Sequence, residues 1–228
     1  NTTHDVSISS VDTSRSIVMY TWRSTLTGNN NDRSWHKAYL TSGTNLRFIS
    51  KSAAFARAIT IEWTVIEFDT GVLASLNSGS ALTPASNPEN IDLSGNPLTD
   101  ATAAIPITSN WSNSGSLAVG DFFNAVVTST TNLRLVFGGT PSGMEVAWQL
   151  PEFSPSAVDV QSGEIALGSA SPGPDGVVSN TAALSPSVNT SKALATKTGQ
   201  YQASMSSVVM NRDLAEVFLT NGSTVTAK

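Results

Sequence analysis

Histidines and paired carboxylates are the residue types of this sequence that could do acid–base chemistry. Only His4 and His36 could serve as the base of a Ser-His-Asp triad. His4 lies near the start of the sequence, and His36 aligns with Phe123 in a second, similar segment. We therefore interpret His36 as a surface residue of a strand, and we expect no catalytic residues and no enzyme.

Glu67 and Glu152 raise the possibility of a second kind of active site. They belong to two similar hexamers, WTVIEF at 63–68 and WQLPEF at 148–153. Two carboxylates that flank one bond are the catalytic groups of most glycosidases. These two glutamates, however, hold the same position in two copies of a motif, so nothing in the sequence brings them to one cleft. We predict instead that each accepts hydrogen bonds at the end of a strand.

A loop rich in oxygen atoms, Asn29–Arg33, lies between Trp22 and Trp35. Asn30 and Asp32 could bind Ca²⁺ or a sugar there, with the two indoles beside them. The loop lacks the ligand spacing of an EF-hand, and turn chemistry alone accounts for its composition. We keep these four residues as ligand-loop candidates, and we expect neither a metal ion nor a cofactor.

The motifs around these residues recur along the chain, which predicts a repeated fold. Residues 38–48 and 125–135 are identical at seven of eleven positions, and residues 217–227 resemble both. The repeat is about 88 residues long. We place the copies at 1–72, 73–155 and 156–228. The third copy is incomplete, because no W-x-x-x-E-F hexamer follows residue 153.

Alternation of apolar and polar residues predicts strands rather than helices in each copy. Residues 59–68 alternate with period two, as does the segment ending at Phe153. A hairpin is expected around Thr41–Thr44, and another strand at 15–22. At 213–218 a helix is the alternative, but the repeat favours a strand.

The hexamers predict how each copy closes its core. We expect Trp63, Trp148, Phe68 and Phe153 to be core anchors, together with Glu67 and Glu152 at the strand ends. Residues 74–97 and 154–187 are rich in Ser, Pro and Gly, and we expect them to be linkers or long surface loops. The predicted fold class is all-β, with tandem small antiparallel sandwich or jelly-roll-like units.

Composition narrows the classes of partner. The net charge is −5 and the pI about 4.9, so nucleic acid is an unexpected partner. No apolar run approaches the length needed to span a bilayer, and we expect no membrane contact. Cysteine is absent, which excludes disulfides and thiolate sites. Ser and Thr make up roughly a quarter of the residues, which suits short strands joined by many turns.

Three segments in a fixed order carry a resemblance to a known family. VDTSRS at 11–16, LTSGTNLRF at 40–48 and WTVIEF resemble repeat domains of tailed-bacteriophage virion proteins. The resemblance implies a non-enzymatic decoration or fibre component at the virion surface, which stabilises the particle or mediates attachment. It also implies a homo-oligomer, for example a trimer, in contact with other virion proteins. The alternative is a secreted or cell-surface carbohydrate-binding or adhesion module, with Trp22, Trp35 or Trp111 stacked on surface glycans.

The incomplete third copy predicts a further contact. A sandwich without its closing strand leaves an unpaired edge and an uncovered core. We expect another chain to supply that strand by β-augmentation, with homo-oligomeric contacts around residues 188–228.

Overall fold

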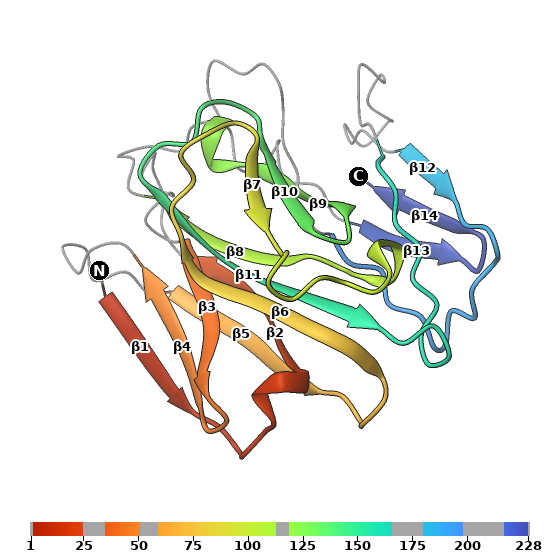
Figure 1. Ribbon diagram of the computed structural model, residues 1–228, viewed down its shortest axis with the longest axis horizontal. Helices are drawn as coiled ribbons and strands as arrows, with labels where there is room; N and C mark the ends of the chain where they lie inside the picture. Colours follow the sequence, from red (N-terminus) through yellow and green to blue (C-terminus); the bar gives the residue numbers. More distant parts are fainter. Residues whose placement is uncertain are drawn as a thin grey trace.

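The computed structural model describes residues 2–24, 35–50, 59–112, 119–165, 180–197 and 217–227. Within these ranges the chain forms antiparallel sheets of two or three strands, joined by turns and three single-turn 3-10 helices. No helix of the described part is long and apolar enough to cross a membrane. The all-β prediction is confirmed (Figure 1).

The strands of the first copy are β1 (Thr2–Ser7), β2 (Ser16–Ser24), β3 (His36–Ser42), β4 (Asn45–Ser50) and β5 (Ile59–Glu67). The second copy has β6 (Leu73–Leu82), β7 (Glu89–Asp92), β8 (Ile107–Ser112), β9 (Phe123–Ser129), β10 (Asn132–Phe137) and β11 (Met144–Phe153). The third has β12 (Asn180–Ala183), β13 (Val217–Asn221) and β14 (Thr224–Ala227). The short 3-10 helices are η1 (Thr13–Arg15), η3 (Ala101–Ala103) and η4 (Val119–Asp121).

One three-stranded sheet occurs in the same form in each copy. Its strand orders are β1-β4-β3, β7-β10-β9 and β12-β14-β13. In every case the residue after the first strand donates its backbone N–H to the turn of the hairpin. These bonds are Ile8 to Thr44, Leu93 to Thr131 and Leu184 to Ser223, at 3.0, 2.8 and 2.9 Å. The recurrence of sequence therefore corresponds to a recurrence of strand order and backbone contacts.

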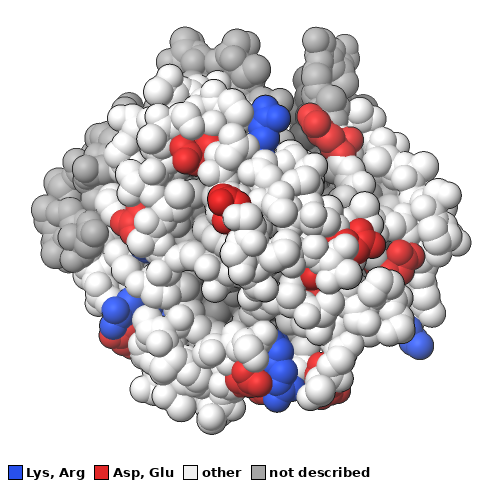
Figure 2. Space-filling model, in the orientation of Figure 1, with Lys and Arg blue, Asp and Glu red and all other residues white. Residues whose placement is uncertain are grey.

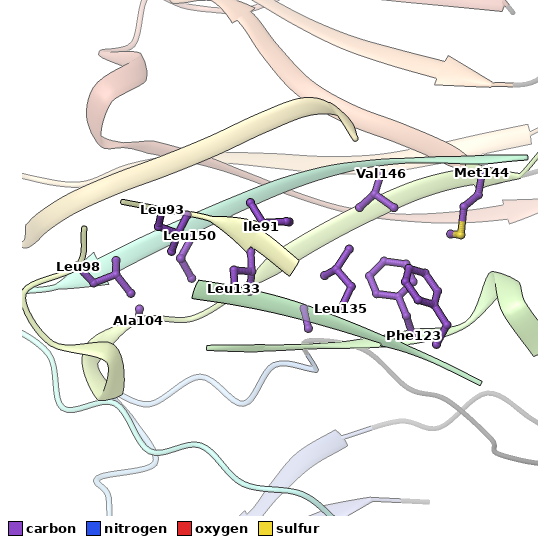
Figure 3. Packing of buried hydrophobic residues seen from close by; sticks show 12 residues of the cluster. Ile91, Leu93, Leu98, Ala104, Phe123, Leu133, Leu135, Met144, Val146 and Leu150 are labelled. Carbon is purple, nitrogen blue, oxygen red and sulfur yellow. The ribbon is translucent and has the colours of Figure 1, made fainter. Parts of the chain in front are cut away.

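A second sheet covers the first to make a sandwich. In the second copy its order is β6-β11-β8, and in the first copy it is β2-β5 alone. Figure 3 shows Met144, Val146 and Leu150 of β11 pointing from one layer toward Leu133 and Leu135 in the other. All five are at most 2% exposed, so the inward positions of β11 are filled as the alternation predicts.

Two of the segments expected to be loops contain strands. Residues 74–97 hold most of β6 and all of β7, and β12 lies within 154–187. The prediction failed at β6 because its inward positions, which include Ser75, Asn77 and Gly79, are polar or lack a side chain. The hairpin turn also consists of two residues, Gly43 and Thr44, because β3 continues to Ser42. Of the segment 213–218, only the last two residues are described, and they begin β13.

The first and second copies pack against each other through polar side chains that cap strand edges. The amide of Gln149 bonds both backbone groups of Val18 on β2, at 2.9 and 3.2 Å. The hydroxyl of Ser109 bonds both backbone groups of Ala38 on β3, at 3.0 and 3.3 Å. Two edges of the first sandwich are thus blocked by the outer face of the second.

A buried lysine crosses the same interface. Lys37 is 2% exposed, and its ammonium group pairs with Glu145 and donates to the carbonyl of Ser80. Both partners belong to the second copy. The two copies are therefore joined by an ion pair whose ammonium group is buried.

Candidate strand-edge interaction site

The second copy shows what a complete outer sheet looks like. β11 pairs with β8 on one edge and with β6 on the other, and Trp148 lies opposite Gly79. A Cβ atom at Gly79 would stand 2.5 Å from Nε1 of Trp148, so the glycine leaves room for the indole. Trp148 packs on the core from this position.

Gly79→Ala should lower the free energy of unfolding by about 1–3 kcal/mol, because the indole of Trp148 has to move out of a packed site. Urea unfolding followed by circular dichroism measures the change. Gly95→Ala is the matched control, since no heavy atom lies within 4 Å of the Cβ position at Gly95. Equal effects of the two substitutions would contradict the packing role of Gly79.

In the first copy, none of the described strands corresponds to β6. Among the described residues, β5 pairs with β2 on one edge and has no strand on the other. Trp63, the counterpart of Trp148, is 39% exposed. The prediction that Trp63 anchors the core is therefore wrong, because no strand of the described part of the chain covers its indole.

The two glutamates of the hexamers hold equivalent hydrogen bonds. Oε1 of Glu67 accepts the backbone N–H of Asp12 at 3.3 Å, and Oε1 of Glu152 accepts that of Asp100 at 2.6 Å. Each aspartate caps a 3-10 helix, η1 or η3. The glutamates thus tie the end of β5 to the turn after β1, and the end of β11 to the turn after β7.

The second partner of each glutamate differs between the copies. In the second copy, Ser75 of β6 donates to Oε2 of Glu152 at 2.7 Å, and Glu152 is 1% exposed. In the first copy, Arg15 pairs with Glu67 at 2.5 Å and with Asp12 at 3.1 Å, and the side chain of Glu67 is 29% exposed. The partly exposed Arg15–Glu67 ion pair therefore takes the place of the hydrogen bond that Ser75 of β6 donates in the second copy.

Hydrogen bonds also tune the capping aspartates. The hydroxyl and backbone N–H of Ser14, and then Arg15, hold the pKa of Asp12 below its usual value. Thr102 lowers the pKa of Asp100 in the same way, through its hydroxyl first and its N–H second. Both carboxylates are thus committed to the turns that they cap, which leaves them poorly suited to acid–base catalysis near neutral pH.

The two phenylalanines of the hexamers meet between the copies. The rings of Phe68 and Phe153 pack edge to face, with centroids 5.4 Å apart. Phe153 is 7% exposed, and Phe68 is half-buried. These residues therefore join one unit to the next as well as closing their own.

The ligand-loop candidates do not form a described site. Asn30 and Asp32 lie outside the described residues. Trp22 is half-buried on β2, opposite Ile61 of β5. Trp35 packs edge to face on Phe122, with centroids 5.2 Å apart. Trp35 thus serves the contact between the copies, which corrects its assignment as an exposed sugar-stacking residue.

Sequence reasoning missed the residues that decide which edges are open. Gln149, Ser109 and Lys37 block edges or cross the interface, and Gly79 admits Trp148. A glycine inside a β-prone segment signals close approach of another group, and that signal was present at Gly79. The polar residues carry no such signal, because they alternate outward on strands and resemble surface residues.

Comparisons with protein-family models, with curated proteins and with solved structures found no match to this chain. Within the described ranges, no group of three or more His, Asp or Glu side chains is placed to hold a metal ion. The open edge of β5, beside which the indole of Trp63 is exposed, is the candidate site for binding another macromolecule.

Proposed function

We propose that this chain is a non-enzymatic structural protein of a tailed-phage virion surface, a decoration or fibre component whose β units assemble edge to edge. The observation that carries the proposal is the open edge of β5, beside which Trp63 is 39% exposed. An unpaired strand edge is a template for another chain, and proteins that stay monomeric usually block it. Here the edges of β2 and β3 are capped by side chains, whereas no strand of the described part of the chain pairs with the edge of β5.

The distribution of charge supports a structural role. Charged residues make up 13% of the sequence, and Figure 2 shows them as separate spots on the face that it draws. Those that pair across strands hold the sheets together: Arg47 of β4 binds Asp5 of β1 at 2.8 Å and lowers its pKa to about 2. Charge is thus used to join strands, and the resemblance to phage repeat domains supplies the virion setting.

Imaging of the native particle by electron microscopy, with the chain labelled, tests the proposal. We expect the label to form a regular array on a capsid or tail. A particle that carries no ordered copies of the chain would overturn the virion role.

The exposed indole of Trp63 favours one alternative, a carbohydrate-binding module, since aromatic faces bind the apolar faces of sugars. A glycan array read with the wild type and with Trp63→Ala separates the two functions. Binding that depends on Trp63, without any array on a particle, would support the module and exclude the virion proposal.

A further inference from the structure

A segment of the third copy shares a Ser-Gly pair with β6 at a similar place in the repeat. Val158–Ile165 follows the second hexamer as β6 follows the first. Ser78-Gly79 of β6 recurs as Ser162-Gly163. The chain therefore contains two segments of the β6 type, as well as two closing strands of the W-x-x-x-E-F type.

The contacts of this segment match those of β6. Asn77 of β6 bonds the turn after β7, donating to the carbonyl of Asn96 at 3.1 Å. Gln161, one residue before Ser162 as Asn77 is before Ser78, bonds the turn after β12. It donates to the carbonyl of Pro186 at 2.8 Å and accepts the N–H of Ser185 at 3.0 Å. Sequence and contact thus give the same alignment, with Gly163 as the counterpart of Gly79.

The difference lies at the glycine. A Cβ atom at Gly79 would meet Trp148, whereas at Gly163 no heavy atom lies within 4 Å. Residues 158–165 also form no strand. The segment thus has the features that receive a closing strand and its Trp, but no described residue supplies either one.

The complementary vacancy is on β5. β6 already pairs with β11, whereas two other elements of the described chain lack the counterpart that β6 and β11 give each other: the open edge of β5 and Val158–Ile165. Among the described residues, β5 has no strand with a glycine opposite Trp63. Val158–Ile165 has no strand with a Trp opposite Gly163.

We propose that Val158–Ile165 of a second copy of this chain adds to the open edge of β5 as an antiparallel strand. This inference rests on the proposed function and names the partner of the same edge. The register follows from β6 and β11, in which Gly79 lies opposite Trp148 and Ser78 opposite Gln149. Gly163 then lies over Trp63, and Ser162 lies opposite Thr64.

The main gain is burial of the indole and of backbone groups along the edge, as in other cases of strand addition. The same register puts Asp159 opposite Glu67, beside Arg15. Charges at this end are solvated and add little to affinity. Because the described part of each chain carries both the donor segment and the edge that it pairs with, the association can continue from copy to copy.

Disulfide trapping tests the register, since the chain contains no cysteine. Directly opposed positions of antiparallel strands have Cβ atoms about 4.5–5.5 Å apart, close to disulfide reach. Mild oxidation of purified Thr64→Cys/Ser162→Cys should give a ladder of covalent oligomers on non-reducing gels. The control is Thr60→Cys/Ser162→Cys, whose first cysteine lies on the same strand face but four residues along. Equal cross-linking of the control, or a cross-link only within single chains, would overturn the proposal.

Gly163→Val gives an independent test by light scattering coupled to size exclusion. The new side chain has room in the free chain but would collide with Trp63 in the pair. We expect wild-type oligomers, and a shift of about tenfold or more in the concentration of half-dissociation for the variant. Gly95→Val, at another glycine with open space, should leave association unchanged. A wild type that stays monomeric at every concentration would sink the inference. These outcomes concern the purified chain, so oligomers without an array on a particle would refute only the virion role.

Discussion

Glu152→Ala should lower the free energy of unfolding by roughly 3–5 kcal/mol. The substitution leaves the N–H of Asp100 and the hydroxyl of Ser75 without their acceptor in a site that is 1% exposed. Each buried donor without a partner costs about 1–3 kcal/mol, and the lost side chain adds a cavity. Urea unfolding at neutral pH, followed by circular dichroism, measures the change.

Two further variants test whether buried hydrogen bonds account for the stabilisation by Glu152. Glu67→Ala removes the equivalent residue of the first copy, where the partners are solvated, and should cost about 1 kcal/mol or less. Glu152→Gln keeps an acceptor for Asp100 and can donate its amide to Ser75, so it should remain close to the wild type. A Glu152→Gln variant as unstable as Glu152→Ala would mean that the hydrogen bonds of the site are not what stabilises it.

The repeat made much of the fold predictable from sequence. The strand at 59–68 and the strand ending at Phe153 alternate with a period of two, because one face of each lies on a core. The shared turn residues around 38–48 and 125–135 fixed the hairpins for a similar reason. Such strands are predictable because the alternation of their own apolar and polar side chains shows which face is buried.

Features that depend on a neighbouring strand could not be predicted from the local sequence pattern. β6 lacks the apolar alternation that predicts a strand, because Gly79 has no side chain and so leaves room for Trp148. The apolar side chain that fills this position belongs to the partner strand β11. Trp63 and Trp148 occupy the same place in the same motif, yet among the described strands only β6, beside Trp148, covers one of the two indoles. The exposure of Trp63, and with it the candidate site, thus depends on a strand rather than on the residues of its own motif.

Lys37 is the strongest example of a residue whose environment comes from another unit. It lies on a strand of the first copy, and its ion-pair partner Glu145 lies on β11 of the second. Lysine side chains are almost never fully buried, so the sequence alone gives no reason to expect Lys37 in the interior. Its burial follows only from the packing of β3 against β8 and β11.

Lys37→Met should therefore destabilise the protein by about 3 kcal/mol or more, since removal of one member of a buried ion pair leaves the other uncompensated. In this variant Glu145, which is 21% exposed, can regain some water. Glu145→Gln instead leaves the ammonium group of Lys37 at 2% exposure, with the Ser80 carbonyl as a neutral partner. Glu145→Gln should therefore lower the free energy of unfolding by more than Lys37→Met. Urea unfolding of both single variants gives the order of the two effects.

The double variant Lys37→Met/Glu145→Leu should recover most of the loss, because apolar replacement of a whole buried pair is often neutral or stabilising. A double-mutant cycle then gives a coupling energy between the two residues. If the two losses simply added, the pair would not be a coupled unit.

The single variants should also make the first and second copies unfold less cooperatively, because Lys37 joins them. Hydrogen exchange would detect this as weaker protection in the first copy than in the second, which has the larger buried cluster.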